Sequence, residues 1–221
     1  MWTELNVYFS NIVRTLICLF FVSVFIVYQR IHKKKNVTPV RRSAAKLLIV
    51  LGSGGHTFEM LRLISNLDGK FRPRIYVLAD TDILSEQKAQ AFEAIKTTNK
   101  SEELYTIEKI PRSREVNQSW LSTIFTTLIS CFHSFLLVLK HKPEAILCNG
   151  PGTCVPLCIS AFFLHVLGWK HIKMIYVESI CRVNTMSLTG KILYNIADHF
   201  LVQWPGLREK YPRAKYLGKL I

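Results

Sequence analysis

A short glycine-rich loop is the first segment whose residue types and spacing could do chemistry. It lies between an apolar run at 46–51 and an amphipathic segment that begins near His56. Small residues at such a turn let a ligand approach backbone N–H groups at the positive end of a helix, and a diphosphate suits that environment. The loop lacks the full dehydrogenase fingerprint and the Walker lysine, so its pattern alone predicts no nucleotide. Its candidate binding residues are Gly52, Ser53, Gly54, Gly55 and Thr57.

A second loop with two glycines follows a short apolar run at 145–148. Its glycines would also let a ligand approach the backbone closely, although an ordinary turn explains them nearly as well. Four of its residues are candidates for binding the same anion: Asn149, Gly150, Gly152 and Thr153.

Two side chains near these loops could carry acid–base chemistry, and we predict both as catalytic residues. His56 opens the helix after the glycine loop, where it could contact a diphosphate or a sugar; a hydrogen bond at the helix start is the alternative. Glu178 stands beside Ser179 and Arg182 and could position or deprotonate a hydroxyl group. An ion pair with Arg182 is the alternative for Glu178, and Arg182 is itself a candidate binding residue.

Metal and cofactor sites are not expected. The six remaining histidines show no metal-ligand spacing, and the six cysteines lack the paired short spacing of a zinc ribbon. Because the cysteines lie in apolar runs, we interpret them as buried, reduced thiols.

The elements that position these residues alternate between strand and helix. The 221 residues are 49% hydrophobic, which excludes collagen-like and wholly disordered chains and permits one domain with a sizeable core. Alternating strands and helices predict an α/β fold with a parallel sheet, whose ligands bind at the carboxyl ends of the strands. The loops at 52–57, 149–153 and 178–182 should therefore meet at one edge. The expected strands are 46–51, 74–79, 104–110, 145–148, 173–177 and 200–202.

The N-terminal region has the composition of a membrane anchor. Between Leu5 and Tyr28 only Arg14 is charged, and these 24 residues exceed the roughly 20 that span a bilayer. A cleaved signal peptide is the competing interpretation, but the run has neither a basic start nor a small-residue cleavage site. We therefore divide the chain into an anchor (1–30), a basic linker (31–45) and a domain (46–221).

The charge distribution sets the expected orientation. The net charge is +14, and residues 1–46 hold eight of the 29 Lys and Arg against one acid. Because basic flanks stay cytosolic, the domain should be cytosolic and the N-terminus lumenal. Three glycosylation sequons, at Asn36, Asn99 and Asn117, should then remain unmodified. The basic cluster could also contact anionic lipid, but it lacks the interleaved aromatics of a nucleic-acid surface, so no nucleic acid is expected.

A second uncharged segment runs from Trp120 to Leu139. Its length would allow a second span, but many Ser and Thr residues interrupt it, and a second span would divide the sheet across the bilayer. We expect a helix that packs on the sheet and contacts the membrane interface, with a plain core helix as the alternative.

Four motifs together resemble the family of asparagine-linked glycosylation protein fourteen, over essentially the whole chain. They are Gly52 to Met60 (GSGGHTFEM), Cys148 to Thr153 (CNGPGT), Tyr176 to Ser179 (YVES) and Leu201 to Pro205 (LVQWP). The resemblance implies a Rossmann-like sheet that forms the amino-terminal, acceptor-side half of a GT-B glycosyltransferase. Such a half is similar to the bacterial GlcNAc transferase of peptidoglycan synthesis, with a membrane anchor added.

The same resemblance implies a two-chain enzyme. A soluble catalytic subunit, asparagine-linked glycosylation protein thirteen, would hold UDP-GlcNAc, and this chain would bring it to the cytosolic face of the endoplasmic reticulum. The complex would add the second GlcNAc to GlcNAc-diphospho-dolichol by an inverting transfer, and a larger assembly would include the first-mannose transferase. The length agrees, since domains of ~100–200 residues leave room for only one Rossmann-like domain.

The end of the chain is the expected docking segment for the catalytic subunit, by the same resemblance. A last strand or a frayed terminus is the alternative. The docking residues would be Tyr216, Leu217, Leu220 and Ile221. Two other classes of function remain open: a self-sufficient nucleotide-dependent enzyme on a Rossmann fold, and a scaffold whose glycine loop binds nothing.

Overall fold

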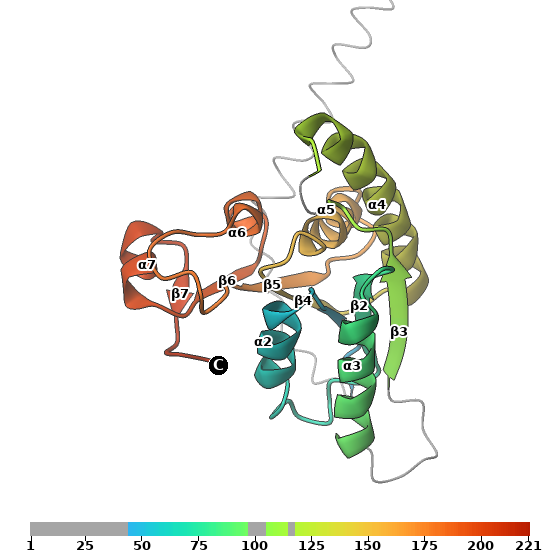
Figure 1. Ribbon diagram of the computed structural model, residues 1–221, viewed down its shortest axis with the longest axis horizontal. Coiled ribbons are helices and arrows are strands. Elements are labelled where there is room, and N and C mark those ends of the chain that lie inside the picture. Colours follow the sequence, from blue (N-terminus) through green and yellow to red (C-terminus); the bar gives the residue numbers. More distant parts are fainter. Residues whose placement is uncertain (1–43, 97–104, 115–117) are drawn as a thin grey trace, which may run out of the picture.

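The structure is a computed structural model that describes residues 44–96, 105–114 and 118–221. These residues form a seven-stranded sheet in the order β3-β2-β1-β4-β5-β6-β7, and every neighbouring pair of strands is parallel (Figure 1). The predicted α/β class is therefore confirmed. The strands are β1 (Leu47–Val50), β2 (Arg74–Ala79), β3 (Tyr105–Ile110), β4 (Ala145–Asn149), β5 (Lys173–Val177), β6 (His199–Val202) and β7 (Lys215–Tyr216).

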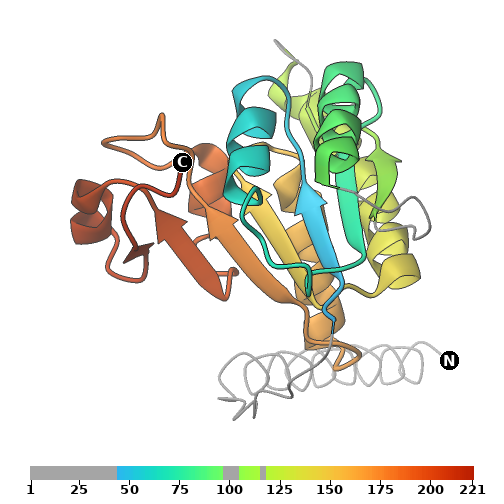
Figure 2. The same ribbon diagram turned by 90° about the horizontal axis from the view of Figure 1, so that it is seen from below.

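Helices cover both faces of the sheet, which is why the central strands are continuous apolar runs (Figure 2). The helices are α2 (Gly55–Leu63), α3 (Ile83–Lys96), α4 (Trp120–His141), α5 (Cys154–Val166), α6 (Leu188–Leu193) and α7 (Pro205–Lys210). Leu48 and Val50 point into the core beneath α4, α5 and α6, whereas Leu47 and Ile49 point into the core beneath α2 and α3.

A buried ion pair fastens α3 to the sheet. Arg74 of β2 donates from Nε to Oε1 of Glu93 over 2.6 Å, and the hydroxyl of Tyr76 donates to the same carboxylate. Both charged side chains are almost completely buried, so each needs the other to offset its desolvation. Burial raises the pKa of Tyr76 above its ordinary value, which keeps the phenol protonated as a donor.

The six expected strands are all present, and none of their ends shifts by more than one residue. The two-residue strand β7 was expected only as an alternative for the tail. Because Asn149 belongs to β4, the second loop starts at Gly150 rather than at Asn149. The expected anchor at 1–30, most of the linker and the acceptor asparagines of all three sequons lie outside the described residues.

The interpretation of the cysteines as buried thiols holds for three of the five that the structure describes. Cys148, Cys154 and Cys158 are buried and Cys131 is intermediate. Burial raises the pKa of Cys148 well above its ordinary value. The prediction is wrong for Cys181, which is exposed because it lies in the loop after β5 rather than in a core element.

Helix α4 packs on the sheet through one side only. Leu137 and Val138 belong to the core, and Ser130 and Ser134 are buried with them. Among the described helices, Leu121–His141 alone is long and apolar enough to cross a membrane. Strands on both sides of α4 in the sequence join one sheet, so α4 does not carry the chain across a bilayer. The expectation of a helix packed on the sheet is confirmed.

Candidate functional site

The loops that follow β1, β3 and β4 meet at the carboxyl edge of the sheet, around an open cleft of about 470 Å³. The cleft is lined by six of the residues expected from the sequence: Gly52, Ser53, His56, Gly150, Gly152 and Thr153. A second hollow of about 350 Å³ adjoins it and is lined by Gly55, Glu59, Ser179 and Arg182, among others. His56 and Gly150 line both. The expected convergence of the three loops is therefore present.

The glycines of the two loops allow a close packing that side chains would prevent. A Cβ on Gly52 would lie 2.5 Å from Cβ of Pro151, so the loops touch at this point. Gly54 has φ +64° and is the N-cap residue of α2. No side chain caps this end of the helix, and its first turn contains no acidic residue. Its first N–H groups remain available to an anion, and the helix dipole favours one.

Thr57 supports the glycine loop from behind. The side chain is completely buried, and its hydroxyl contacts the carbonyl oxygen of Gly52 and lies 2.6 Å from Oγ of Ser85. Ser85 in turn donates to Asp82 over 2.7 Å. This arrangement fits a role in holding the loop better than the direct ligand contact expected from the sequence.

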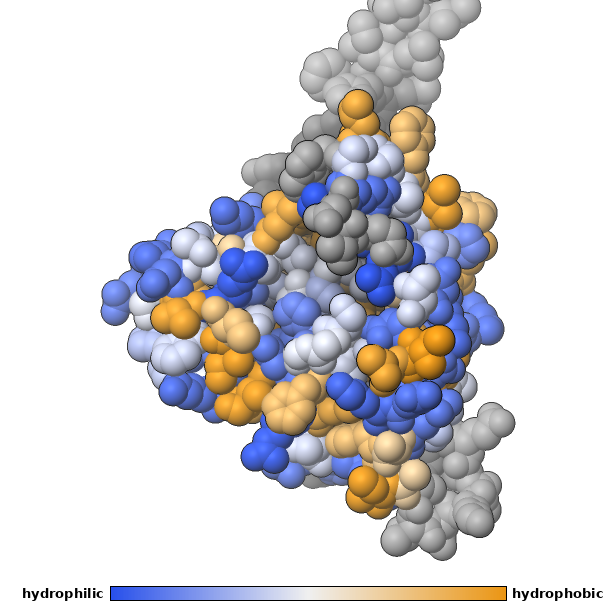
Figure 3. Space-filling model, viewed as in Figure 1, coloured by the Kyte–Doolittle hydropathy of each residue, from blue (hydrophilic) through white to orange (hydrophobic). Residues whose placement is uncertain are grey.

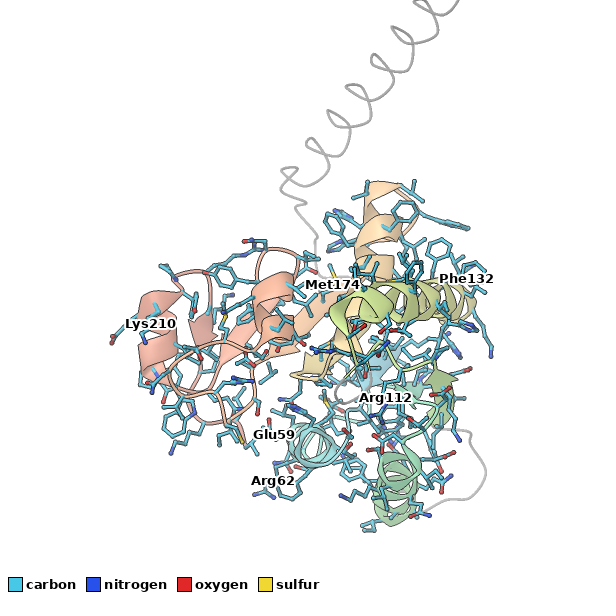
Figure 4. The ribbon with its side chains drawn as sticks, turned by 45° about the horizontal axis from the view of Figure 1, so that its top comes forward. Glu59, Arg62, Arg112, Phe132, Met174 and Lys210 are labelled. Atoms are coloured by element: carbon cyan, nitrogen blue, oxygen red, sulfur yellow. The ribbon has the colours of Figure 1, made fainter. Side chains whose placement is uncertain are left out.

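His56 is connected to a buried polar chain. Its Nδ1 lies 3.3 Å from Oδ1 of Asn149, whose side chain is completely buried rather than open to the cleft. Nδ2 of Asn149 donates to Glu59 over 3.0 Å, and Ser179 donates to the same carboxylate over 2.7 Å. Figure 4 shows Glu59 on α2, with Arg62 on the outer side of the same helix. Glu59 was not among the residues expected from the sequence, although its i+3 spacing from His56 puts both on one helix face.

Glu178 is also completely buried, and its carboxylate is used within the protein. It accepts hydrogen bonds from N of Ser187 over 3.0 Å and from the hydroxyl of Tyr176 over 3.3 Å. Burial raises the pKa of Tyr176, so this phenol stays a donor. A Cβ on Gly190 would overlap Oε2 of Glu178, which shows how tightly the carboxylate sits at the start of α6.

These contacts change the interpretation of Glu178. The carboxylate lines neither hollow, so it is better placed to hold the loop at 178–187 than to take a proton from a substrate. The alternative ion pair with Arg182 is not formed either, although the structure describes both residues. Arg182 is exposed and lines the second hollow.

Two arginines that were not expected from the sequence line the main cleft. Arg112 and Arg114 belong to the loop after β3, and Figure 4 shows Arg112 near the centre of the view. A guanidinium group can bind a phosphate through two parallel hydrogen bonds, so this wall can supply positive charge to an anion. The sequence does contain a pattern that indicates these arginines. An Arg-Ser-Arg sequence follows an expected strand, and the carboxyl ends of strands in a parallel sheet are where ligands bind.

The expected docking residues lie at the far edge of the sheet from β3. Tyr216 belongs to β7, which pairs with β6 as the outermost strand, and Leu217 is 65% exposed. Leu220 and Ile221 are half-buried, and the backbone N–H of Leu220 donates to Gln203 over 3.2 Å. The tail is therefore an ordered edge that exposes apolar side chains. Within the described residues no group of three or more potential metal ligands occurs.

Comparison with known sequences yields a family match over most of the chain. A family model described as oligosaccharide biosynthesis protein Alg14 like matches residues 47–220. The human protein named UDP-N-acetylglucosamine transferase subunit ALG14 is 50% identical over 205 residues, 90% of this chain and 94% of that protein. The rat protein of the same name is 54% identical over 188 residues, 84% and 86% of the two chains. The counterpart of Schizosaccharomyces pombe is 46% identical over 176 residues, 78% and 81%.

Two solved structures share the fold. The crystal structure of MurG from Acinetobacter baumannii has a TM-score of 0.56 at 15% identity and covers 80% of this chain. The UDP-N-acetylglucosamine 2-epimerase from Rickettsia bellii has a TM-score of 0.52 at 15% identity and also covers 80%. This chain spans 44% of the MurG chain and 45% of the epimerase chain. The sheet and its helices are thus one GT-B-like half.

Proposed function

Because this chain belongs to the Alg14-like family of oligosaccharide biosynthesis proteins, we propose that it is the acceptor-binding, membrane-anchoring subunit of a two-chain UDP-GlcNAc transferase. It binds GlcNAc-diphospho-dolichol and recruits the soluble catalytic subunit, asparagine-linked glycosylation protein thirteen, to the cytosolic face of the endoplasmic reticulum. The complex then adds the second GlcNAc. Residues 1–30 form a single-pass anchor with a lumenal N-terminus, and the domain remains cytosolic.

The observation that carries this proposal is the cleft at the carboxyl edge of the sheet. The described residues supply one parallel sheet with a cleft at its carboxyl edge, and the chain spans 44% of the MurG chain that it resembles in fold. A transferase needs sites for a donor and an acceptor. The cleft of the described residues offers one such site, and the human relative, which this chain covers to 94%, is named a transferase subunit; this supports a second protein as the source of the other site.

The main cleft has the chemistry that a lipid-linked diphosphate requires. The first turn of α2, with its backbone N–H groups, reaches the cleft at His56, and Arg112 and Arg114 line the same cleft. Both kinds of donor bind phosphate oxygens. We place the diphosphate between them and the sugar beside His56, where the two hollows adjoin.

His56 is the residue that we propose as the general base. In this step a hydroxyl oxygen of the acceptor sugar attacks the anomeric carbon of UDP-GlcNAc, and UDP leaves with the electron pair of the broken bond. The hydroxyl proton passes to Nε2 of His56, and attack from the face opposite to UDP inverts the anomeric centre. Glu178 contributes indirectly, by holding the loop that carries Ser179 and Arg182.

The outer face of α4 and α5 supports a contact with the membrane surface. Figure 3 shows hydrophobic side chains along the outer side of α4, at the upper right of the view. So many strongly exposed apolar side chains on neighbouring helices are unusual on a soluble surface and are typical of interfacial binding. The most exposed of these side chains on α4 are Leu121, Ile124, Phe125, Leu128 and Phe132, and Phe163 on α5 and Trp169 just after α5 are exposed as well.

The proposal is tested by a transfer assay with separated components. UDP-GlcNAc and lipid-linked GlcNAc diphosphate are supplied to the full chain alone, to the soluble subunit alone, and to the two together in membranes. We expect transfer only from the third mixture. Transfer by this chain alone would support the self-sufficient enzyme, and transfer by the soluble subunit alone in the same membranes would reduce this chain to a scaffold.

A further inference from the structure

The buried amide of Asn149 has a defined orientation. Its nitrogen Nδ2 lies 3.0 Å from Oε2 of Glu59 and 3.3 Å from the carbonyl oxygen of Val177. Both neighbours are acceptors only, so an amide nitrogen satisfies them and an amide oxygen in its place would face two oxygens. Oδ1 of Asn149 must therefore be the atom that faces His56.

Glu59 is itself held in place by three donors. Besides Asn149, the hydroxyl of Ser179 donates to Oε1 over 2.7 Å and the backbone N–H of Ile180 donates to Oε2 over 3.4 Å. A buried carboxylate with its oxygens satisfied has little freedom to turn. The orientation of Asn149 therefore derives from contacts made by α2 and by the loop after β5.

An amide oxygen can only accept a hydrogen bond, and this decides which nitrogen of His56 carries the proton. Nδ1 lies 3.3 Å from Oδ1 of Asn149, so it binds only when it is protonated. In the neutral ring the other nitrogen, Nε2, then has a free lone pair. His56 lines both hollows, and Gly150 packs against its ring.

We propose that Asn149 and Glu59 are positioning residues that hold neutral His56 as the Nδ1–H tautomer, with the Nε2 lone pair available to the acceptor hydroxyl. The inference rests on the proposed function, in which Nε2 takes the proton of that hydroxyl. When the ring becomes positively charged in the transition state, Nδ1–H still donates to Oδ1 and the ring keeps its orientation. In this arrangement a buried amide fixes the tautomer, as a carboxylate does in a serine protease triad.

The tautomer can be measured directly, independently of activity. The full chain is labelled with 15N at its histidines and assembled with the unlabelled soluble subunit in lipid nanodiscs, at a pH where the ring is neutral. Correlations between ring nitrogens and ring protons show which nitrogen is protonated, and loss of the signals in His56→Gln assigns them. We expect Nδ1–H in the native chain and loss of this preference in Asn149→Leu. Nε2–H in the native chain, or Nδ1–H that persists in Asn149→Leu, would overturn the proposal.

Asn149→Leu could lose the tautomer simply because it misfolds, so a second test exchanges the amide and the carboxylate between positions 149 and 59. Asn149→Asp alone sets two carboxylates against each other, and we expect kcat to fall by roughly 10²–10⁴-fold with little change in the KM for the lipid acceptor. Combining Asn149→Asp with Glu59→Gln restores a hydrogen-bond donor between the two side chains. The amide introduced at position 59 can donate to the carboxylate introduced at position 149. The second oxygen of that carboxylate then accepts from Nδ1–H of His56. Glu59→Gln alone keeps an acceptor oxygen for Asn149 and measures what the negative charge of Glu59 contributes.

The double variant should keep Nδ1–H and recover most of the lost kcat. Loss of the Nδ1–H tautomer in the double variant, with the complex still assembled, would overturn the positioning role. Retention of the tautomer without recovery of kcat would support the positioning role and contradict the assignment of His56 as the base. The two failures are therefore distinguishable.

Discussion

The imidazole ring of His56 occupies the space into which a Cβ atom on Gly150 would project. Gly150 also has φ +69°, a conformation that side-chain-bearing residues rarely adopt. The loop after β4 and the first turn of α2 are therefore matched to each other: glycine at one position makes room for histidine at the other.

This relationship predicts that Gly150→Ala displaces His56. The left-handed backbone should cost about 1–2 kcal/mol of unfolding free energy, and transfer by the complex should fall by at least about tenfold as the ring moves. Thermal unfolding and kcat measure the two effects. Gly206→Ala is the matched control, because a Cβ at Gly206 meets nothing within 4 Å and its φ is not positive. Native kcat in a folded Gly150→Ala complex would show that the position of His56 is unimportant.

The arginines of the cleft should govern binding of the lipid acceptor. Arg112→Gln and Arg114→Gln each remove charge-assisted hydrogen bonds, so the KM for the lipid-linked substrate should rise by roughly 10–100-fold while the KM for UDP-GlcNAc changes little. Arg62→Gln on the outer side of α2 is the control for lost positive charge. Equal effects on the two KM values, or the same effect from Arg62→Gln, would argue against a diphosphate at this wall.

The apolar face of α4 should hold the domain to membranes when the anchor is removed. A chain lacking residues 1–30 should still sediment with anionic vesicles, and the double change Leu128→Glu with Phe132→Glu should release it, since both side chains are strongly exposed. Ile95→Glu alters an 85% exposed side chain on α3 and should have no effect. Complete resistance of the truncated chain to salt and carbonate extraction would contradict the single-span topology.

The C-terminal edge should dock the soluble subunit. Buried apolar anchors commonly contribute more than about 1 kcal/mol each, so a chain that ends at Lys215 should lose affinity for its partner by orders of magnitude. Leu217→Asp, which leaves β7 in place, should weaken coprecipitation without disturbing the sheet. Undiminished recovery of the partner by both variants, with transfer unchanged, would mean that the tail is an ordinary edge strand.

Sequence patterns predicted the strands well because the central ones are buried on both faces and appear as uninterrupted apolar runs, as in Leu47–Val50 and Arg74–Ala79. Strand β7 was harder to recognise because it has only two residues and both are exposed. The positions of the glycine loops could be predicted from the alternation of strands and helices, because each loop follows the carboxyl end of a strand.

The roles of buried polar residues depend on contacts that sequence spacing does not reveal. Glu178 stands at a strand end like a catalytic acid, but Ser187, nine positions later, turns its carboxylate inward. Glu59 and Asn149 are 90 residues apart, and only the fold brings them together. Arg112 could have been found, because it follows an expected strand.

In the proposed division of labour, this chain holds the acceptor and leaves the donor to its partner. Equilibrium binding to the full chain in lipid nanodiscs, without the soluble subunit, tests this with two ligands: lipid-linked GlcNAc diphosphate and UDP-GlcNAc. We predict saturable binding of the lipid-linked ligand only, and its loss in Gly55→Val, where the new side chain meets no protein atom within 4 Å of its Cβ and projects into free space beside the cleft. Saturable binding of UDP-GlcNAc, or failure to bind the lipid-linked diphosphate, would contradict this division.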